Sequence, residues 1–258
     1  CFFFNTAIGK FQRTQLRKRF ESGEFDSVLK RIDLLSANDN TVPDWFYQPL
    51  CTPKQLRHTR QQTPKGSILI FMDAGVLGQT VCQQFEQISI PYIKVSNAVS
   101  FEKYNAEHYG INLQRSQDYH QLIKDLLTQQ VDIATVLYLG SYQDNANVMD
   151  SNETLRAAQF QGSHGLLFLI QALAQSRDPH PPTRLLVVTA NLQAVQADEQ
   201  TCYIHGALTG LLKTIPLELS WIQCQHLDLE SSVASLPQVN CIMDELAQPC
   251  IDTAIAYR

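Results

Sequence analysis

The chain has 258 residues, of which 44% are hydrophobic and 17% are charged, and its net charge is -5. This composition excludes a disordered or low-complexity protein and predicts one large globular unit or two small ones. The longest apolar stretches, such as Gly165 to Ala174, fall well short of the roughly 20 residues that a membrane span needs, so no membrane association is expected.

The first 65 residues are basic, with eleven Lys and Arg against six Asp and Glu, whereas residues 66–258 hold nine against nineteen. Apolar residues recur among these charges at steps of three to four, which predicts one amphipathic helix from Arg13 to Leu35 with a solvated charged face. The apolar positions are Leu16, Phe20, Phe25, Val28, Leu29, Ile32 and Leu35. A nucleic-acid site would combine the charges with aromatic platforms or glycines over a longer stretch, so no nucleic acid is expected.

Polar residues from Asn38 to Pro43 follow this helix and predict a domain boundary near residue 40. We therefore expect a basic helix and linker over residues 1–40 and a second domain over residues 41–258. The first residue is Cys1 rather than Met, so the chain is expected to be a piece of a longer protein. The short run Phe2 to Phe4 precedes its positive charges, which is the reverse of a signal peptide.

From residue 67 onward, short apolar runs alternate with longer amphipathic stretches. Nearly continuous apolar strands separated by long crossovers predict an α/β fold with a doubly wound, mostly parallel, Rossmann-like sheet and helices on both faces. The expected strands are Ser67 to Met72, Tyr92 to Val95, Ile133 to Leu139, Arg184 to Thr189 and Ile222 to Leu227. The expected helices are Leu77 to Gln87, Gln117 to Leu127, Asn152 to Ala174, Ile204 to Ser220 and Leu236 to Ala247. Asp150 or Ser151 is expected to cap the third of these helices.

The cysteines and histidines form no pattern that predicts a disulfide framework or a metal site. The seven cysteines are at least nine residues apart, and the seven histidines include no i, i+4 pair. Reduced thiols in a cytoplasmic protein fit this spacing best, and no metal ligands are assigned.

The turn after the first strand is the place to test for a dinucleotide site, because the G-x-G-x-x-G fingerprint binds pyrophosphate there. Gly75 and Gly78 stand at the second and third glycine positions, but Asp73 replaces the first. A carboxylate at this point repels phosphate and can accept the amide hydrogens of the following helix. No cofactor-binding residue is therefore assigned.

The chemistry of short-chain reductases requires a Tyr with a Lys four residues later, which lowers the pKa of the phenol. Tyr203 is followed at this spacing by Ala207, and Tyr104, Tyr119 and Tyr138 also lack the lysine. Gly162-Ser163-His164-Gly165 lacks the spacing of a nucleophile elbow and lies in a helical pattern. No catalytic residue is assigned.

A degenerate glycine loop without a Tyr/Lys pair resembles the non-catalytic structural subdomain of modular polyketide synthase ketoreductases. The resemblance covers about residue 41 to the end of the chain. It rests on the following segments: Asp44 to Leu50, Asp73 to Gly78, Val95 to Phe101, Asp118-Tyr119 with Leu122, Leu166 to Leu173, Val187-Val188-Thr189, Gly210 to Glu218, and Leu227 to Leu229. Cys51, in place of a frequent Trp, and the order Pro216-Leu217 depart from the family pattern.

This resemblance implies that the chain braces a separate catalytic subdomain, which carries the intact glycine loop, the catalytic Tyr and NADPH. Ala256-Tyr257-Arg258 looks like the connection into that subdomain. The implied partners are the catalytic ketoreductase subdomain of the same polypeptide, neighbouring synthase domains and an acyl carrier domain.

Residues 5 to 20 resemble the C-terminal end of adenylate-forming ligases, which carry a T-x-x-G-K-x-x-R motif. Thr6, Gly9, Lys10 and Arg13 match it. In that family the lysine neutralises charge that develops between the carboxylate and the α-phosphate. The resemblance implies a parent synthetase in which a ligase precedes a ketoreductase. Two alternatives to a structural half stay open: a docking module for a carrier or partner domain, and an independent nucleotide-binding Rossmann-like enzyme.

Overall fold

The computed structural model describes residues 13–36, 51–54, 66–142, 151–176, 181–196, 199–231 and 235–258. The chain divides into two compact units, residues 1–52 and 53–258. The boundary predicted near residue 40 and the matched residues Thr6, Gly9 and Lys10 lie outside the described residues.

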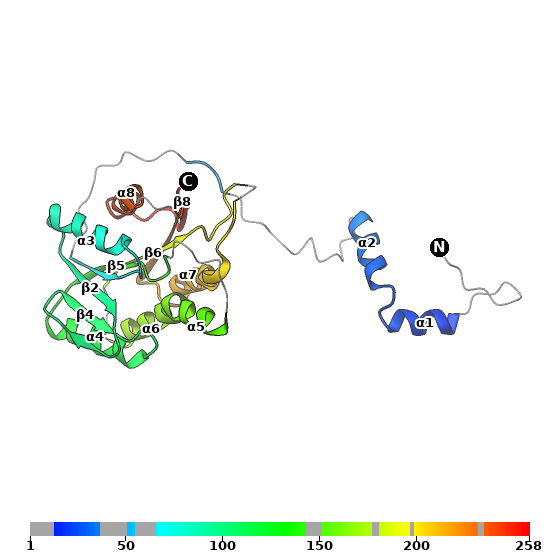
Figure 1. The fold of residues 1–258 in the computed structure, drawn as a ribbon, viewed down its shortest axis with the longest axis horizontal. Coiled ribbons are helices and arrows are strands. Elements are labelled where there is room, and N and C mark those ends of the chain that lie inside the picture. Colours follow the sequence, from blue (N-terminus) through cyan, green and yellow to red (C-terminus); the bar gives the residue numbers. More distant parts are fainter. Residues whose placement is uncertain are drawn as a thin grey trace, which may run out of the picture. The chain divides into compact units, whose positions relative to one another are not determined.

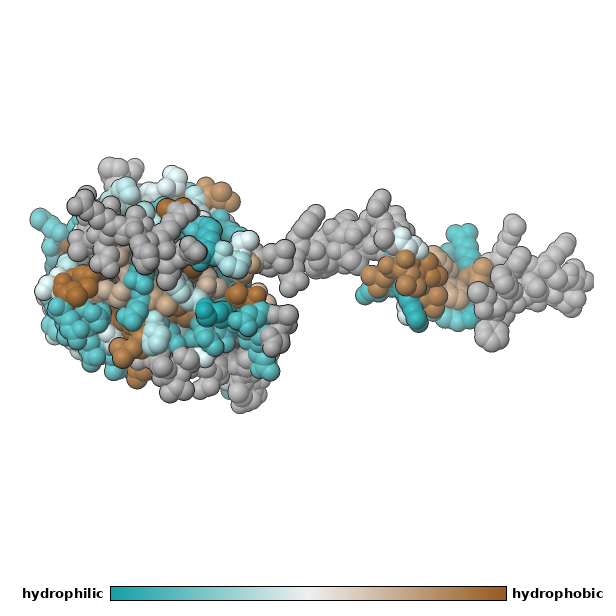
Figure 2. All heavy atoms as spheres, turned by 90° about the horizontal axis from the view of Figure 1, so that it is seen from above, coloured by the Kyte–Doolittle hydropathy of each residue, from teal (hydrophilic) through white to brown (hydrophobic). Residues whose placement is uncertain are grey.

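The first unit has two helices where the sequence predicted one. Helix α1 spans Arg13–Glu21 and helix α2 spans Asp26–Ser36. The prediction of a single helix is wrong because Gly23 adopts a φ of 76°, a backbone conformation that glycine tolerates and that ends a helix. No described residue of α2 is buried, and Figure 2 shows hydrophobic side chains gathered on the surface of these helices.

The second unit is built on an eight-stranded sheet with the order β3-β4-β2-β1-β5-β6-β7-β8. All neighbouring strands are parallel except β3 and β4, so the predicted doubly wound, mostly parallel sheet is confirmed. The strands are β1 (Ser67–Phe71), β2 (Tyr92–Asn97), β3 (Glu102–Lys103), β4 (His108–Ile111), β5 (Ile133–Tyr138), β6 (Thr183–Ala190), β7 (Ile222–Leu229) and β8 (Ala254–Ala256).

Helices cover both faces of this sheet (Figure 1). They are α3 (Leu77–Gln87), α4 (Ser116–Thr128), α5 (Asn152–Gln161), α6 (Ser163–Ala174), the short 3-10 helix η2 (Tyr203–His205), α7 (Ala207–Glu218) and α8 (Ser235–Leu246). One core lies between the sheet and α4, α6 and α7, and the other lies under α3 and α8. Successive residues of β1 alternate between them: Leu69 and Phe71 belong to the first, Ile68 and Ile70 to the second. Strands buried on both faces therefore read as continuous apolar runs.

The long helix predicted from Asn152 to Ala174 is broken into α5 and α6 at Gly162. The break is held by the buried hydroxyl of Tyr138, which donates to the carbonyl of Gln161 at 2.7 Å. The cap of α5 is confirmed, because Ser151 Oγ accepts the amide hydrogen of Thr154 at 3.2 Å. Apolar periodicity continues across the break, so the sequence pattern does not reveal it.

Strands β3, β4 and β8 were not predicted, because none is longer than four residues. Gly110 interrupts the short apolar run of β4, and its close neighbours leave no room for a side chain at this position. A Cβ at this position would lie 2.8 Å from both the Cβ of Ala98 and the hydroxyl of Tyr104. A short run with an internal glycine does not resemble a strand in sequence.

Candidate functional site

The carboxyl ends of the parallel strands meet at one edge of the sheet, where doubly wound folds bind their ligands. The strand order reverses between β1 and β5, so the turn that joins β1 to α3 lies at the switch point. The candidate site is therefore this turn together with the ends of β6 and β7.

The turn after β1 is occupied by a side chain of the chain itself. Oδ2 of Asp73 accepts the amide hydrogen of Gly75 at 2.9 Å, and Oδ1 accepts that of Gly78 at 2.7 Å. As expected, Asp73 accepts an amide hydrogen of the following helix, that of Gly78, and it also accepts that of Gly75 in the turn. These are donors that a phosphate group would need.

Both glycines in this turn are explained by the carboxylate. A Cβ on Gly75 would lie 2.9 Å from Oδ2 of Asp73, and a Cβ on Gly78 would lie 2.7 Å from Oδ1. Any side chain at these two positions would displace the carboxylate. The two glycines that remain of the fingerprint therefore leave room for the carboxylate of Asp73.

Tyr203 and the residue four positions after it, Ala207, do not form a Tyr/Lys pair. Tyr203 lies in η2 with 62% of its surface exposed, and Ala207 begins α7. The structure does bring a different pair together, since Nζ of Lys103 lies 5.3 Å from the ring centre of Tyr109. Sequence reasoning missed this pair because the two residues lie on β3 and β4 and are not four positions apart.

The Lys103–Tyr109 pair is bound to a carboxylate and has a structural role. Oδ2 of Asp125 accepts hydrogen bonds from Nζ of Lys103 at 2.9 Å and from the Tyr109 hydroxyl at 2.7 Å. These bonds lower the pKa of Asp125. The phenol proton is thus held by an ionised acceptor, and Tyr109 is buried. The cluster fastens α4 to the edge of the sheet.

A buried polar chain lies at the carboxyl ends of β6 and β7, and the sequence analysis did not identify it. The hydroxyl of Thr189 donates to Oδ1 of Asp228 at 2.6 Å. Nε2 of His226 lies 2.8 Å from the same hydroxyl, and Nε2 of Gln193 lies 3.0 Å from Nδ1 of His226. Since Thr189 uses its proton on Asp228, His226 must donate from Nε2 and accept at Nδ1.

This order of donors differs from that of a catalytic triad, where the histidine lies between the hydroxyl and the carboxylate. Here Thr189 is central, only 1% exposed, and already committed as a donor. Burial lowers the pKa of His226, while Asp228 acts in the opposite direction. The arrangement therefore organises the strand ends and presents no accessible nucleophile.

Asp228 is fully buried and its two oxygens accept four hydrogen bonds. Besides Thr189, the donors are the amides of Leu192 and Gln193 at 2.8 and 2.9 Å and Nη2 of Arg258 at 2.8 Å. Arg258 also forms an ion pair with Glu199. Burial raises the pKa of Glu199, but amide hydrogen bonds from Val195 and Gln196 and the Arg258 guanidinium lower it below its ordinary value.

The buried His205 is the least satisfied polar group near this edge. It is only 3% exposed, and neither ring nitrogen has a hydrogen-bond partner. The ring lies against Gly162, where an added Cβ would be 2.5 Å from Nδ1. Burial lowers its pKa to about 4, so the imidazole is neutral at pH 7.

The other sequence candidates do not form a site. The hydroxyl of Ser163 donates to Oε1 of Gln159 at 2.6 Å, at the start of α6 rather than at a strand-to-helix turn. In the described parts of the chain, no three His, Cys, Asp or Glu side chains gather as metal ligands. The cysteines at 51, 82, 202, 224, 241 and 250 are free. No helix among the described residues is long and apolar enough to cross a membrane.

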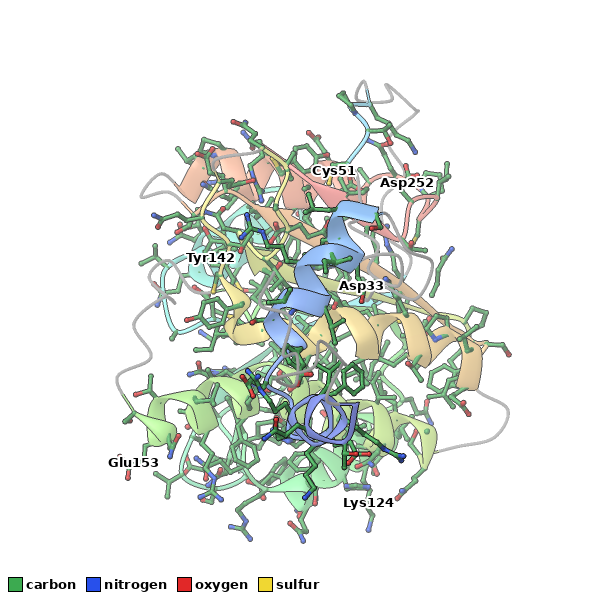
Figure 3. All side chains as sticks on the ribbon, turned by 90° about the vertical axis from the view of Figure 1, so that its right-hand side faces the viewer. Asp33, Cys51, Lys124, Tyr142, Glu153 and Asp252 are labelled. Atoms are coloured by element: carbon green, nitrogen blue, oxygen red, sulfur yellow. The ribbon has the colours of Figure 1, made fainter. Side chains whose placement is uncertain are left out.

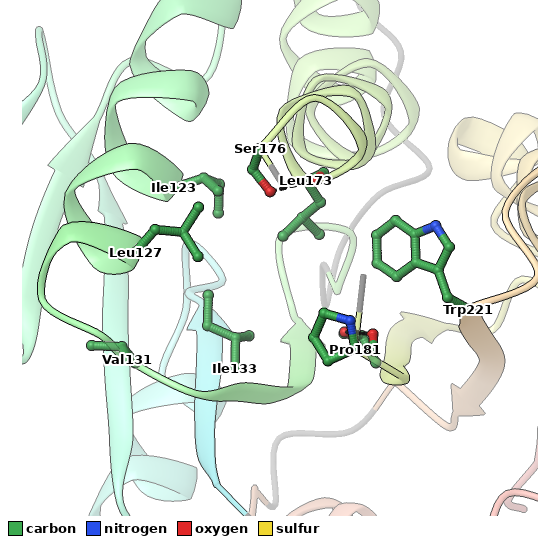
Figure 4. A pocket seen from close by; sticks show the side chains of 9 residues that line it. Ile123, Leu127, Val131, Ile133, Leu173, Ser176, Pro181 and Trp221 are labelled. Atoms are coloured by element: carbon green, nitrogen blue, oxygen red, sulfur yellow. Dashed lines mark hydrogen bonds between the residues drawn. The ribbon is translucent and has the colours of Figure 1, made fainter. Parts of the chain in front are cut away.

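A small cavity at the opposite, amino edge of the strands is too small for a cofactor (Figure 4). Its volume is about 20 Å³, and its walls include Ile123, Leu173 and Trp221. Ligand sites usually have several hundred Å³, whereas this one holds at most a single water molecule.

The basic charge of the first unit is partly neutralised locally. Arg17 forms an ion pair with Glu21 at 2.8 Å, and Arg19 pairs with Glu24. These contacts support the expectation of a solvated charged face and weaken the case for a basic recognition helix.

A family model described as beta-ketoacyl synthase-like, N-terminal, matches residues 66–246. No curated protein sequence matches the chain. Among solved structures, the adenylation, ketoreductase and pseudo Asub multidomain structure of a keto acid-selecting NRPS module is 28% identical, with a TM-score of 0.73. That match covers 99% of this chain and 21% of the other, so this chain spans about a fifth of its length.

Two further structures share the fold of the second unit. An N-terminal ketoreductase from a macrolactin assembly line has 18% identity and a TM-score of 0.60 over 77% of this chain and 40% of that one. A short-chain dehydrogenase/reductase from Serratia marcescens has 9% identity and a TM-score of 0.55 over 74% of this chain and 95% of that one. The family model and the NRPS module structure agree with the ketoreductase resemblance of the second unit, and the two structures below 25% identity share its fold.

Proposed function

Because the chain belongs to the beta-ketoacyl synthase-like, N-terminal family, we propose that it is the non-catalytic structural half of a ketoreductase domain. The parent is a cytoplasmic polyketide synthase or hybrid synthetase. In this role the chain braces a separate catalytic subdomain that carries out NADPH-dependent β-ketoacyl reduction. Neighbouring synthase domains and an acyl carrier domain complete its surroundings.

The observation that carries this proposal is the carboxylate of Asp73 on the amides of Gly75 and Gly78. A pyrophosphate would have to displace an internal anion that already satisfies these donors and would repel it. The lack of a lysine beside Tyr203 agrees, since a reductase site needs both the cofactor and the proton donor. The proposal assigns NADPH to the partner subdomain alone.

Titration calorimetry with NADPH tests this assignment. We expect no binding tighter than about 100 μM, which corresponds to roughly -5.5 kcal/mol. Tighter binding would overturn the structural role and favour an independent nucleotide-binding enzyme.

A second measurement tests the bracing. The catalytic subdomain is produced alone and together with residues 53–258, and its thermal unfolding and ketoreduction are compared. We expect a higher midpoint and greater activity in the presence of the structural half. Identical properties in both preparations would contradict the bracing role.

We further propose that helices α1 and α2 are the end of an adenylate-forming ligase that precedes the ketoreductase. The match that extends over 99% of the chain is to a structure that includes an adenylation domain. The matches to structures described only as reductases cover 73–77%. The exposed apolar side chains of α2, such as Ile32 and Leu35, then pack on that ligase domain.

Limited proteolysis of the 258-residue chain tests this division. We expect early removal of the first unit and a stable core over the second. Amide protection of Leu29 and Ile32 equal to that of β1 would contradict it.

A further inference from the structure

The guanidinium of Arg258 lies in a socket that satisfies each of its five N–H groups. Nε donates to Glu199 Oε1, Nη1 to the carbonyls of Asp228 and Tyr257 at 3.3 and 2.9 Å, and Nη2 to the carbonyl of Gln193 and to Oδ2 of Asp228 at 2.9 and 2.8 Å. Its side chain is only 8% exposed. An arginine that uses its whole donor set has a fixed position and direction.

The socket joins segments that are far apart in sequence. Gln193 and Glu199 belong to the loop that follows β6, Asp228 lies near the end of β7, and Arg258 follows β8. The amide of Tyr257 also donates to the carbonyl of Asp228 at 2.9 Å. Asp228 and Arg258 both contact the loop and the residue after β8, and Arg258 adds side-chain bonds to the carbonyls of Gln193 and Tyr257.

A second, partly buried arginine makes its contacts at the other end of β6. Arg184, near the start of β6, donates to the carbonyls of Glu245, Leu246 and Gln248 at 2.7, 3.4 and 2.8 Å. These contacts fix the end of α8 and the residues directly after it. Arg184 is thus a control for the loss of a partly buried cation that does not contact the loop or Tyr257.

We propose that Arg258 is a positioning residue that, together with Asp228, makes loop residues 191–196 and 199–202 and the end of β8 move as one body. Through this coupling, the loop sets the direction of any polypeptide joined after residue 258. The identity of that polypeptide as the catalytic reductase subdomain rests on the proposed function. The coupling between the loop and β8 does not.

Hydrogen exchange of the 258-residue chain tests the coupling. In Arg258→Ala we expect the amides of Leu192, Gln193 and Tyr257 to exchange at least about tenfold faster, together, while β1 is unchanged. Arg184→Ala should accelerate exchange near the end of α8 and leave these three amides unchanged. Faster exchange of the loop without Tyr257, or an equal change in every strand, would overturn the proposal.

Arg258→Lys keeps the test usable if Arg258→Ala does not fold. Its ammonium group remains beside Asp228 but cannot span all the acceptors of the guanidinium. We expect a smaller acceleration, about threefold, that again affects the loop and Tyr257 together. Acceleration of only one of the two segments would overturn the coupling in this variant as well.

A polypeptide in which the reductase subdomain follows residue 258 tests the consequence for the partner. Arg258→Ala should lower kcat for ketoreduction about fivefold at unchanged KM for NADPH, and Arg184→Ala should not. An unchanged kcat would overturn the positioning of the partner. NADPH binding by the 258-residue chain would instead overturn the proposed function and would leave the exchange result intact.

Discussion

Helices α2 and α4 have the same kind of apolar pattern but differ in what covers it. In α4, Tyr119 and Ile123 are buried against the sheet, whereas in α2 the corresponding face, including Ile32 and Leu35, is 52% and 80% exposed at those two residues. The outward side of α4 carries polar residues such as Lys124, which points away from the sheet (Figure 3). Periodicity therefore predicts that a helix has an apolar face, but not that the same chain supplies its partner.

The distinction extends to polar groups. Within the second unit, the carboxylates of Asp73 and Asp228 and the guanidinium of Arg258 have their partners inside the chain. His205 is buried without a hydrogen-bond partner, and the apolar face of α2 is likewise not buried by any of the described residues. Substitutions at these positions measure how much an internal partner contributes to the stability of each group.

The largest effect is expected where a buried ion pair is broken. Asp228→Ala removes the carboxylate that accepts four hydrogen bonds and leaves Glu199 as the remaining ion-pair partner of Arg258 among the described residues. We expect the free energy of unfolding to fall by about 3–5 kcal/mol in urea titrations. Asp252→Ala is the control, because Asp252 forms an exposed ion pair with Lys54 and its loss should change stability by less than about 1 kcal/mol. Similar effects in both variants would contradict the role of burial.

The second prediction tests the two helices directly. Ile123→Ala in α4 removes buried methyl groups from the core and should cost about 2–5 kcal/mol of unfolding free energy. Ile32→Ala in α2 should change the stability of the chain by less than about 0.5 kcal/mol. Urea unfolding followed by circular dichroism measures both. A substantial loss in Ile32→Ala would mean that this face is covered within the chain.

Most of the second unit could be predicted from its sequence, because long apolar strands and amphipathic helices leave strong periodic signals. The bounds of α3 agree with the sequence at both ends. The short strands β4 and β8 and the break at Gly162 depend on contacts with distant segments, so they leave no local pattern.

The candidate site was predictable only in part. Asp73, Gly75 and Gly78 are close in sequence, so their chemistry could be inferred from the spacing. The Asp228 network joins residues from the loop after β6, from β7 and from beyond β8, which only the parallel register brings together. Asp228 itself stood in a recognised segment, Leu227 to Leu229, but nothing nearby indicated Arg258 as its partner.

The third prediction concerns His205 and acid. In the folded chain its pKa is lowered to about 4 by burial, from an ordinary value of 6.5. Between these pH values the unfolded chain binds one more proton, so stability decreases as the pH falls, by up to about 3 kcal/mol. His205→Leu should remove this part of the pH dependence and should not destabilise the chain at pH 7, where both ring nitrogens lack partners. An unchanged slope between pH 6.5 and 4 would show that His205 does not titrate in this way.

The smallest effect is expected at Asp73, where the covered groups are two backbone amides in a partly exposed turn. Asp73→Ala loses both hydrogen bonds and should cost about 1 kcal/mol of unfolding free energy, as for other helix-capping residues. Asp73→Asn keeps one oxygen acceptor and should cost about half as much. Inorganic phosphate tests whether the carboxylate occupies the two amides in the wild type. Phosphate should raise the thermal midpoint of Asp73→Ala, whose amides are free, and leave the midpoint of the wild type unchanged. Equal stabilisation of both proteins by phosphate would mean that the carboxylate does not occupy these donors, and the main support for a structural role would be lost.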